Sequence, residues 1–516
     1  MTENNSHNGD DALALDLVTA GKPALVWRRR VADTETPVSA ALKTMEAQRG
    51  DIILESVEGG ETRGRYSLIG LAPDLVFRAN EHRAEINADW ANDRSKFSPC
   101  TLTALDALRA LANECRIDMP DILPPALACL VGYFGYETVG LVEALPRAQA
   151  SELALPDMFF VRPTVILVFD RLKDEMFLIA PVWPNAGAGS CADAKILFDR
   201  ANERLDLVEQ KLGAICPAAE NVNTNLAIPP SDLSLKSILP PGRYCEMVQS
   251  AKDYIKAGDI FQVVLAQRFT APFALPPIDL YRSLRRINPS PFLYFLDLPD
   301  FALIGSSPEI LVRSRGGEVT IRPIAGTRPR GANTIQDAEN RASLLADPKE
   351  RAEHLMLLDL GRNDIGRVAA AESIKVTDSY MVEFYSHVMH IVSNVTAKLA
   401  AGKDAIDALF AGFPAGTVSG APKVRACEII AELESETRGA YAGGVGYFSP
   451  NGDMDSCIVL RTAVIKDGIM HVQAGAGIVA DSNADYEQAE CEAKAGALIA
   501  AAREALRVAA EPRFGQ

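Results

Sequence analysis

A segment rich in Pro, Asn and Ser divides the chain into two halves of different pattern. It runs from Ala214 to Gly242, shows no hydrophobic periodicity and contains Pro229-Pro230 and Pro240-Pro241. Neither a helix nor a strand can continue through such a stretch, so we predict a linker. The predicted parts are a disordered tail over 1–12, an N-terminal domain over 20–213, the linker over 214–242 and a C-terminal domain over 243–510. Two or three domains are expected for 516 residues.

Short β-type runs bounded by turns predict sheets that are mostly antiparallel. Those of the first half are Asp51–Ser56, Tyr66–Leu71, Cys129–Tyr136 and Val161–Phe169. Those of the second half include Ile260–Phe269, Leu293–Leu298, Gly443–Phe448, Ser456–Ile465 and Met470–Ala476. Tight turns such as Pro450-Asn451-Gly452 and Lys466-Asp467-Gly468 join neighbouring runs, as in hairpins. Helical patterns such as Lys423–Leu433 and Tyr486–Val508 interrupt them, which indicates an α+β fold.

Charge and cysteine usage limit the classes of partner. The chain has 52 basic and 68 acidic residues and a net charge of −16, so nucleic-acid backbones and anionic membranes are poor partners. Its nine cysteines form no C-x-x-C pair and fit neither a disulfide framework nor a zinc site. The first residues are polar and no apolar run approaches the roughly 20 residues of a membrane span. We expect a soluble, cytoplasmic protein.

Two pairs of glutamates are candidates for a metal site. Glu350 and Glu353 begin one predicted helix, and Glu487 and Glu490 begin another at the same spacing. Residues three apart share a helix face, so each pair can direct two carboxylates to one point. Four carboxylates suit a hard cation such as Mg²⁺. The alternative is that acidic residues in a first helical turn serve capping and the helix dipole, and spacing alone leaves both open.

Other candidates each have a second explanation. Glycines in PIAGTRPRG, GTVSGAPK and QAGAGIV, among them Gly326, Gly475 and Gly477, form either anion-binding backbone or tight turns. His390 lies in an apolar segment typical of a core histidine. Arg461 ends a buried-looking run, where a charge requires a partner such as a carboxylate.

Motifs along the second half resemble those of the chorismate-utilising enzymes, in family order from about Tyr244 to Ile499. They include FQVVLAQRF (261–269), GSSPEILVR (305–313), PIAGTRPRG (323–331), GTVSGAPKVRA (416–426), DSCIVLRT (455–462) and QAGAGIVADS (473–482). In the first half, ILESVEGGETRGRYSLIG (53–70) resembles the regulatory domain of anthranilate synthase component I. The resemblance implies antiparallel sheets packed as a sandwich flanked by helices, with an N-terminal regulatory region.

The resemblance also implies a role for each candidate. Glu309 would be the general acid, with His390, Gln262 and Thr417 as further catalytic residues. The substrate-binding residues would be Gly326, Thr327, Tyr441, Arg461, Gly475, Gly477 and Lys494. The Mg²⁺ ligands would be Glu350, Glu353, Glu487 and Glu490. A feedback inhibitor, tryptophan, would bind at Glu55, Ser56, Pro291, Phe292, Leu293, Tyr447 and Cys457.

Two positions distinguish reactions within this family. Relatives that add water to chorismate carry a lysine base where this chain has Gln262, and glutamine cannot deprotonate water. Aminodeoxychorismate synthases carry PIKGT, whose lysine attacks the ring, whereas this chain has Ala325 in PIAGT. The resemblance therefore implies direct attack by ammonia and anthranilate formation. The alternatives are an aminodeoxychorismate synthase component I and a catalytically silent tryptophan-binding regulator.

The ammonia source implied by the resemblance is a second protein. The family obtains ammonia from a glutamine amidotransferase, and no nucleophilic-cysteine motif surrounds any cysteine of this chain. We expect a partner subunit of the anthranilate synthase component II type, in a heterotetramer of two large and two small subunits. The small-molecule partners would be chorismate and tryptophan.

Overall fold

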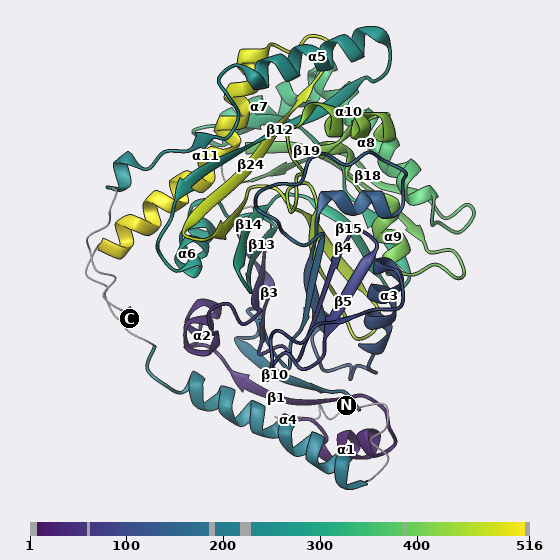
Figure 1. The fold of residues 1–516 in the computed structure, drawn as a ribbon, viewed down its shortest axis with the longest axis vertical. Helices are drawn as coiled ribbons and strands as arrows, with labels where there is room; N and C mark the ends of the chain where they lie inside the picture. Colours follow the sequence, from purple (N-terminus) through teal and green to yellow (C-terminus); the bar gives the residue numbers. More distant parts are fainter. Residues whose placement is uncertain (1–7, 59–61, 185–190, 217–228, 386–387, 511–516) are drawn as a thin grey trace.

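The computed structural model describes residues 8–58, 62–184, 191–216, 229–385 and 388–510, and confirms an α+β fold (Figure 1). In these ranges two antiparallel sheets of twelve strands each pack as a sandwich. Phe301 of one sheet meets Tyr133 and Phe159 of the other, with ring centroids 6.0 and 6.3 Å apart. Helices flank the sandwich, α5 and α11 near one end and α1 and α4 near the other (Figure 1).

Each sheet contains strands from both halves of the chain. The first runs in the order β1 (Ala24–Val31), β10 (Glu175–Val182), β9 (Val165–Asp170), β3 (Thr62–Leu71), β2 (Asp51–Glu58), β13 (Phe292–Leu298), β14 (Phe301–Ser307), β23 (Thr462–Lys466), β24 (Ile469–Ile478), β12 (Gln262–Pro272) and β11 (Lys236–Ser237), with β20 (Gly420–Ala421) also on β12. The second runs in the order β17 (Ile324–Pro329), β19 (Val388–Lys398), β16 (Glu318–Ile321), β15 (Ile310–Arg315), β22 (Met454–Ile458), β21 (Gly444–Phe448), β7 (Leu130–Phe134), β8 (Met158–Arg162), β4 (Leu75–Asn80), β5 (Arg83–Asn87) and β6 (Ser98–Pro99), with β18 (Lys375–Phe384) also on β19.

The α-helices are α1 (Asp11–Thr19), α2 (Pro37–Thr44), α3 (Ala104–Glu114), α4 (Cys191–Leu212), α5 (Arg243–Ala257), α6 (Pro277–Ile287), α7 (Thr334–Ala346), α8 (Pro348–Gly366), α9 (Ala405–Gly412), α10 (Lys423–Leu433) and α11 (Ala484–Ala510). Short 3-10 turns are η1 (Tyr136–Leu141), η2 (Pro230–Asp232) and η3 (Gly416–Val418). None of the helices in these ranges is long and apolar enough to cross a membrane.

The two halves join along strand pairs β2–β13 and β7–β21. Leu293 of β13 lies opposite Glu55 of β2, and Gly444 of β21 lies opposite Phe134 of β7. Each sheet therefore contains strands from both sides of the predicted boundary, and the hydrogen bonds between these strands make one continuous core. The division of the chain at 214–242 stays a prediction, and residues 217–228 lie outside the described ranges.

Two long predicted strands are wrong, because each of them is divided into two shorter strands that belong to different sheets. Ser456–Ile465 divides into β22 and β23, which belong to different sheets, and Arg461 between them has φ +48°. Val161–Phe169 likewise divides at Pro163 into β8 and β9. A continuous apolar run shows burial but cannot show that the chain changes layers within it.

The disordered tail predicted over 1–12 extends too far, because its last residues are helical. Asp11 and Ala12 belong to α1, and the side chain of Asp10 accepts a hydrogen bond from the backbone N–H of Leu13. This is an N-cap, which satisfies a donor that the first helical turn leaves free. Residues 1–7 lie outside the described ranges.

Candidate active site

The carboxyl group of Glu309 lies where the chain passes from β14 in one sheet to β15 in the other. The residue is 7% exposed, and burial raises the pKa of its side chain to about 8. Thr417 of η3 donates its hydroxyl to Glu309 Oε1 over 3.2 Å, which opposes this rise. A carboxyl with this pKa is mostly protonated at neutral pH, so Glu309 can give a proton to a leaving group.

His390 on β19 is held in one orientation by β17. Its Nδ1 lies 3.1 Å from the Gly326 carbonyl oxygen and 3.1 Å from Thr327 Oγ1. Burial lowers the pKa of the imidazole to about 4, so the ring is neutral at neutral pH. A carbonyl oxygen can only accept, which assigns the proton to Nδ1 and leaves Nε2 free to accept one. His390 can therefore act as a base through Nε2.

Arg461 places a positive charge near this histidine. Its backbone has the left-handed φ of +48° at the change of sheet, and its charge lowers the pKa of His390. Burial also lowers the pKa of the guanidinium itself, and Arg461 has no carboxylate partner within the described ranges. A partly buried cation without an anion is a site for a ligand carboxylate.

The neighbouring wall, formed by β12 and β24, is built on two glycines. A Cβ at Gly475 would stand 2.8 Å from the Leu265 carbonyl oxygen and 2.9 Å from Tyr441 Oη. A Cβ at Gly477 would stand 2.6 Å from Gln262 Nε2. The glycines therefore allow the Tyr441 and Gln262 side chains to lie against the strand, and Gly475 hydrogen-bonds Tyr441 through its backbone.

The two glutamate pairs come together from α8 and α11. The pKa of Glu353 is raised by burial and further by the charges of Glu350 and Glu490, and that of Glu487 by burial and by Glu490. Helix capping does not account for the four glutamates, because the side chains of Asp347 and Asn483 accept the first-turn N–H groups of α8 and α11.

The carboxylates of the four glutamates suit a hard cation, but two of them are in ion pairs with basic side chains. Arg328 holds Glu350 at 2.9 Å and Lys494 holds Glu490 at 2.7 Å. No three His, Cys, Asp or Glu side chains in the described part of the chain are arranged to ligate a metal. Carboxylate oxygens are the ligands that Mg²⁺ prefers, so the four glutamates fit the ion by their chemistry alone.

Two other predicted substrate residues border this group. Gly326 has φ +74°, and a Cβ there would lie 3.1 Å from Glu350 Oε2, so the backbone of β17 passes directly beside the carboxylate. Lys494 also donates to the Gly475 carbonyl oxygen over 2.8 Å. These contacts link the glutamates to the same wall as Tyr441.

A buried ion pair missed by the sequence analysis supports this site. Arg438, which is 3% exposed, binds Glu434 through Nη2 at 2.6 Å and donates to the carbonyl oxygens of Val418 and Val264, both at 2.7 Å. It therefore ties η3, which carries Thr417, to β12. The sequence does contain an arginine four residues after a glutamate at a helix end. This spacing is also common on exposed helices, so it does not identify a buried ion pair.

The predicted tryptophan residues lie on both faces of the strand pair β2–β13. Glu55 and Leu293 are directly opposite and share one face, whereas Ser56 and Phe292 are the next residues along each strand and face the other way. On that second side, Ser307 pairs with Phe292 and hydrogen-bonds Cys457 of the facing sheet. Pro291 precedes β13, and Tyr447 lies on β21 beside Asp455.

Glu55 is already bound to other side chains. It accepts hydrogen bonds from Tyr281 Oη at 2.6 Å, Arg285 Nε at 2.8 Å and Arg171 Nη2 at 2.5 Å. Burial acts to raise the pKa of this carboxyl, but Arg285 and its other partners lower it overall. The Glu55 side chain is therefore a structural anion that joins β2 to α6.

Comparison with known proteins gives matches over most of the chain. Residues 51–500 match the family of chorismate binding enzymes. The anthranilate synthase component 1 of Cereibacter sphaeroides is 50% identical over 94% of this chain and 96% of its own, and that of Thermus thermophilus is 44% identical over 91% and 96%. A crystal structure of anthranilate synthase component I from Streptococcus pneumoniae has a TM-score of 0.72 at 36% identity, covering 91% of this chain and 98% of that one. The menaquinone-specific isochorismate synthase of Escherichia coli, with a TM-score of 0.68 at 19% identity over 95% and 99%, shares the fold.

Proposed function

Because the chain belongs to the family of chorismate binding enzymes, we propose that it is the chorismate-converting subunit of an anthranilate synthase. It joins ammonia to chorismate and releases water and pyruvate, leaving anthranilate, the first step of tryptophan biosynthesis. The observation that carries the proposal is that a buried acid, Glu309, a buried imidazole, His390, and Arg461, which has no carboxylate partner among the described residues, all lie around Tyr385.

Glu309 supplies the proton for the first step. The ring hydroxyl of chorismate leaves as water when Glu309 protonates it, and ammonia attacks the ring carbon next to the carboxylate. The enclosed carboxyl is suited to this role because burial keeps its proton in place at the pH of the cell.

His390 and Arg461 serve the second step. Loss of pyruvate from the aminated ring requires removal of a ring proton, and His390 Nε2 is the free acceptor. Arg461, with Tyr441 beside Gly475, receives the carboxylate of the enolpyruvyl side chain. Fixed charges that meet developing charge in a buried site lower the barrier without reorganisation.

Ammonia attacks directly because no lysine stands at either distinguishing position. Gln262 lies against Gly477, where it can hydrogen-bond the nucleophile but cannot deprotonate water. Ala325 is 8% exposed on β17 and has no nucleophilic atom. These two side chains favour amination over hydration and over a covalent intermediate.

The carboxylates of α8 and α11 would hold Mg²⁺. When bound, the ion neutralises the ring carboxylate of chorismate and so fixes the ring in the pocket. The residues that would hold it are Glu350, Glu353, Glu487 and Glu490. Arg328 and Lys494 stabilise Glu350 and Glu490 until then, because unpaired carboxylates this close repel one another.

A glutaminase partner and feedback control complete the proposed function. The relatives are named component 1, which supports a component 2 partner that produces ammonia from glutamine. Tryptophan would bind between the sheets near Ser56, Phe292 and Cys457, where Ser307 connects the two layers.

A turnover assay of the isolated chain tests this proposal. Purified protein with chorismate, Mg²⁺ and ammonium at alkaline pH is expected to produce fluorescent anthranilate, and added tryptophan to suppress it. Chorismate that disappears without anthranilate would indicate an aminodeoxychorismate synthase, and no turnover would indicate a regulator without catalysis.

A further inference from the structure

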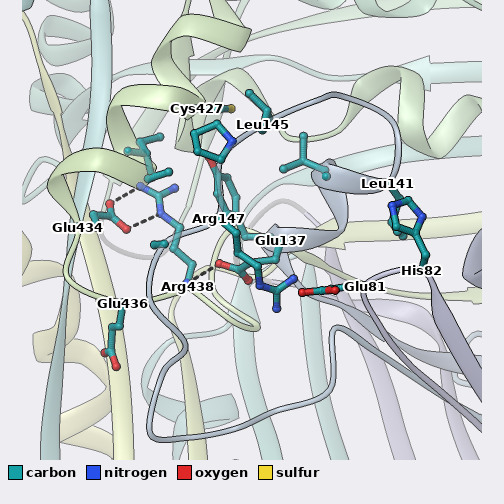
Figure 2. Close-up of a pocket in the computed structure, with 17 residues that line it drawn as sticks. Glu81, His82, Glu137, Leu141, Leu145, Arg147, Cys427, Glu434, Glu436 and Arg438 are labelled. Carbon is teal, nitrogen blue, oxygen red and sulfur yellow. Dashed lines mark hydrogen bonds and ion pairs between the residues drawn. The ribbon is translucent and has the colours of Figure 1, made fainter.

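A second cavity, of about 220 Å³, lies outside the site described above (Figure 2). It is lined by η1, the loop over 145–148, the turn at Glu81 and His82, and the segment from α10 to Arg438. Neither Glu309, His390 nor any of the four metal-site glutamates lines it. A cavity of roughly 150 Å³ holds a molecule as large as benzene, so this one has room for a small organic ligand.

The Glu137 carboxylate is the central polar group of this cavity. It accepts backbone N–H hydrogen bonds from Arg438 at 2.7 Å and from Gly439 at 3.0 Å. Burial raises the pKa of Glu137 to about 7. No cationic side chain in the described ranges forms an ion pair with it, but the two backbone N–H groups and the nearby charge of Arg147 stabilise its ionised form.

The other charged groups around the cavity are already paired, with one exception. Arg438 binds Glu434, Arg147 binds Asp157 at 2.7 Å, and Glu436 is held by Arg268 at 2.8 Å. The exception is Glu81, which lies near Arg147 but makes no side-chain ion pair among the residues described (Figure 2). The lining therefore has a surplus of negative charge.

Tyr136 belongs to the wall of the cavity. It is 6% exposed, and its hydroxyl group lies against the Cys427 thiol, with which it hydrogen-bonds. The acceptors that the wall leaves for a ligand are therefore the carboxylates of Glu137 and Glu81.

We propose that this cavity is a binding site for a small molecule with a primary ammonium group on a short apolar body. The ammonium group donates to the Glu137 carboxylate, and its charge offsets those of Glu137 and Glu81. The apolar body contacts Val139, Leu141, Leu145 and Ile430.

Calorimetric titration with n-butylammonium, 1-butanol and butyrate at pH 7.5 and constant ionic strength tests the site. The amine is protonated there, like that of lysine. Butylammonium is expected to bind, and Glu137→Gln to weaken it by at least about tenfold, because the variant keeps the shape but loses the charge. The matched control is Glu152→Gln, an exposed residue outside the cavity, which is expected to bind as the parent does.

Three results would overturn the proposal: no binding of butylammonium, equal binding of 1-butanol, or unchanged binding in Glu137→Gln. Stronger binding of butyrate would also overturn it, since that would make the arginines dominant. If Glu137→Gln does not fold, Glu81→Gln removes the second negative charge of the cavity and is expected to weaken binding; normal affinity in that variant would reject the site. Because no turnover is measured, the outcome is independent of the reaction that the chain catalyses.

Discussion

Glu309 and His390 are two titratable side chains whose surroundings move their pKa values in opposite directions. Burial raises the pKa of the carboxyl to about 8 and lowers that of the imidazole to about 4. At neutral pH the carboxyl therefore carries the proton that a leaving hydroxyl needs, and the imidazole is free to receive one. Such a separation of pKa values assigns the acid and the base.

Glu309→Gln is expected to lower kcat by about 10²–10⁴-fold, because glutamine has no proton to give. In the parent protein, turnover at a fixed concentration of free ammonia should fall as the pH rises through about 8, since Glu309 is active only below its pKa. The variant should lose this descending limb. Glu318→Gln, an exposed residue of β16, serves as the control. A variant that keeps full turnover would remove Glu309 from the mechanism.

Glu353→Gln is expected to weaken Mg²⁺ binding in the presence of chorismate by at least about tenfold. Glu353 is the carboxylate whose pKa is raised by glutamates of both helices, so it lies between them. Isothermal titration with Mg²⁺ measures the loss, and Glu339→Gln on the exposed face of α7 is the matched change. Unaltered affinity would place the metal elsewhere.

At the scale of elements, the ion pair Arg438–Glu434 joins η3, β12 and the end of α10. Arg438→Met is expected to destabilise the fold by about 3–5 kcal/mol, because it leaves Glu434 buried without a cation. Urea unfolding measures the change through its midpoint. Arg425→Met, in a pair with Asp259 whose two side chains are 36% and 34% exposed, should cost less than about 1 kcal/mol. Equal losses in the two variants would contradict the structural role of Arg438.

Substitutions on the two faces of β2 are expected to have different effects, one on stability and the other on tryptophan inhibition. Glu55→Gln breaks the contacts with Arg285 and Arg171 and is expected to cost about 3 kcal/mol of stability. Ser56→Ala, on the opposite face, should leave stability nearly unchanged but raise the tryptophan concentration for half-inhibition several-fold. Thermal melts and inhibition curves of both variants measure this. A Ser56→Ala protein with normal sensitivity would exclude that face as the inhibitor site.

Several elements could be predicted because their signals are local. Helix α10 begins and ends at the predicted residues, and the glutamates on α8 and α11 follow from spacing along a helix. The changes of sheet at Pro163 and Arg461 could not be predicted, since burial looks the same on either side of the sandwich. The ion pair of Arg438 with Glu434 could not be predicted because its four-residue spacing is also common on exposed helices. The cavity beside Glu137 could not be predicted because it depends on contacts between segments about 300 residues apart, as between Arg438 and Glu137.

At the scale of the molecule, one sheet connects the proposed inhibitor residues with the proposed acid. Strand β2, which carries the predicted inhibitor residues, is hydrogen-bonded to β13, and β13 to β14, which leads directly to Glu309. A ligand wedged between the layers at Ser56 and Phe292 would act on the same strands that position the acid. Binding of tryptophan and chorismate would then oppose each other through one rigid path.

We expect this chain alone to aminate chorismate and to aromatise the product. Mass spectrometry of the products formed from chorismate, ¹⁵N-labelled ammonium and Mg²⁺ tests both steps at once. The expected products are ¹⁵N-anthranilate and pyruvate in equal amounts, with both lost in Glu309→Gln. An aminated or hydroxylated ring that accumulates without pyruvate would contradict this expectation.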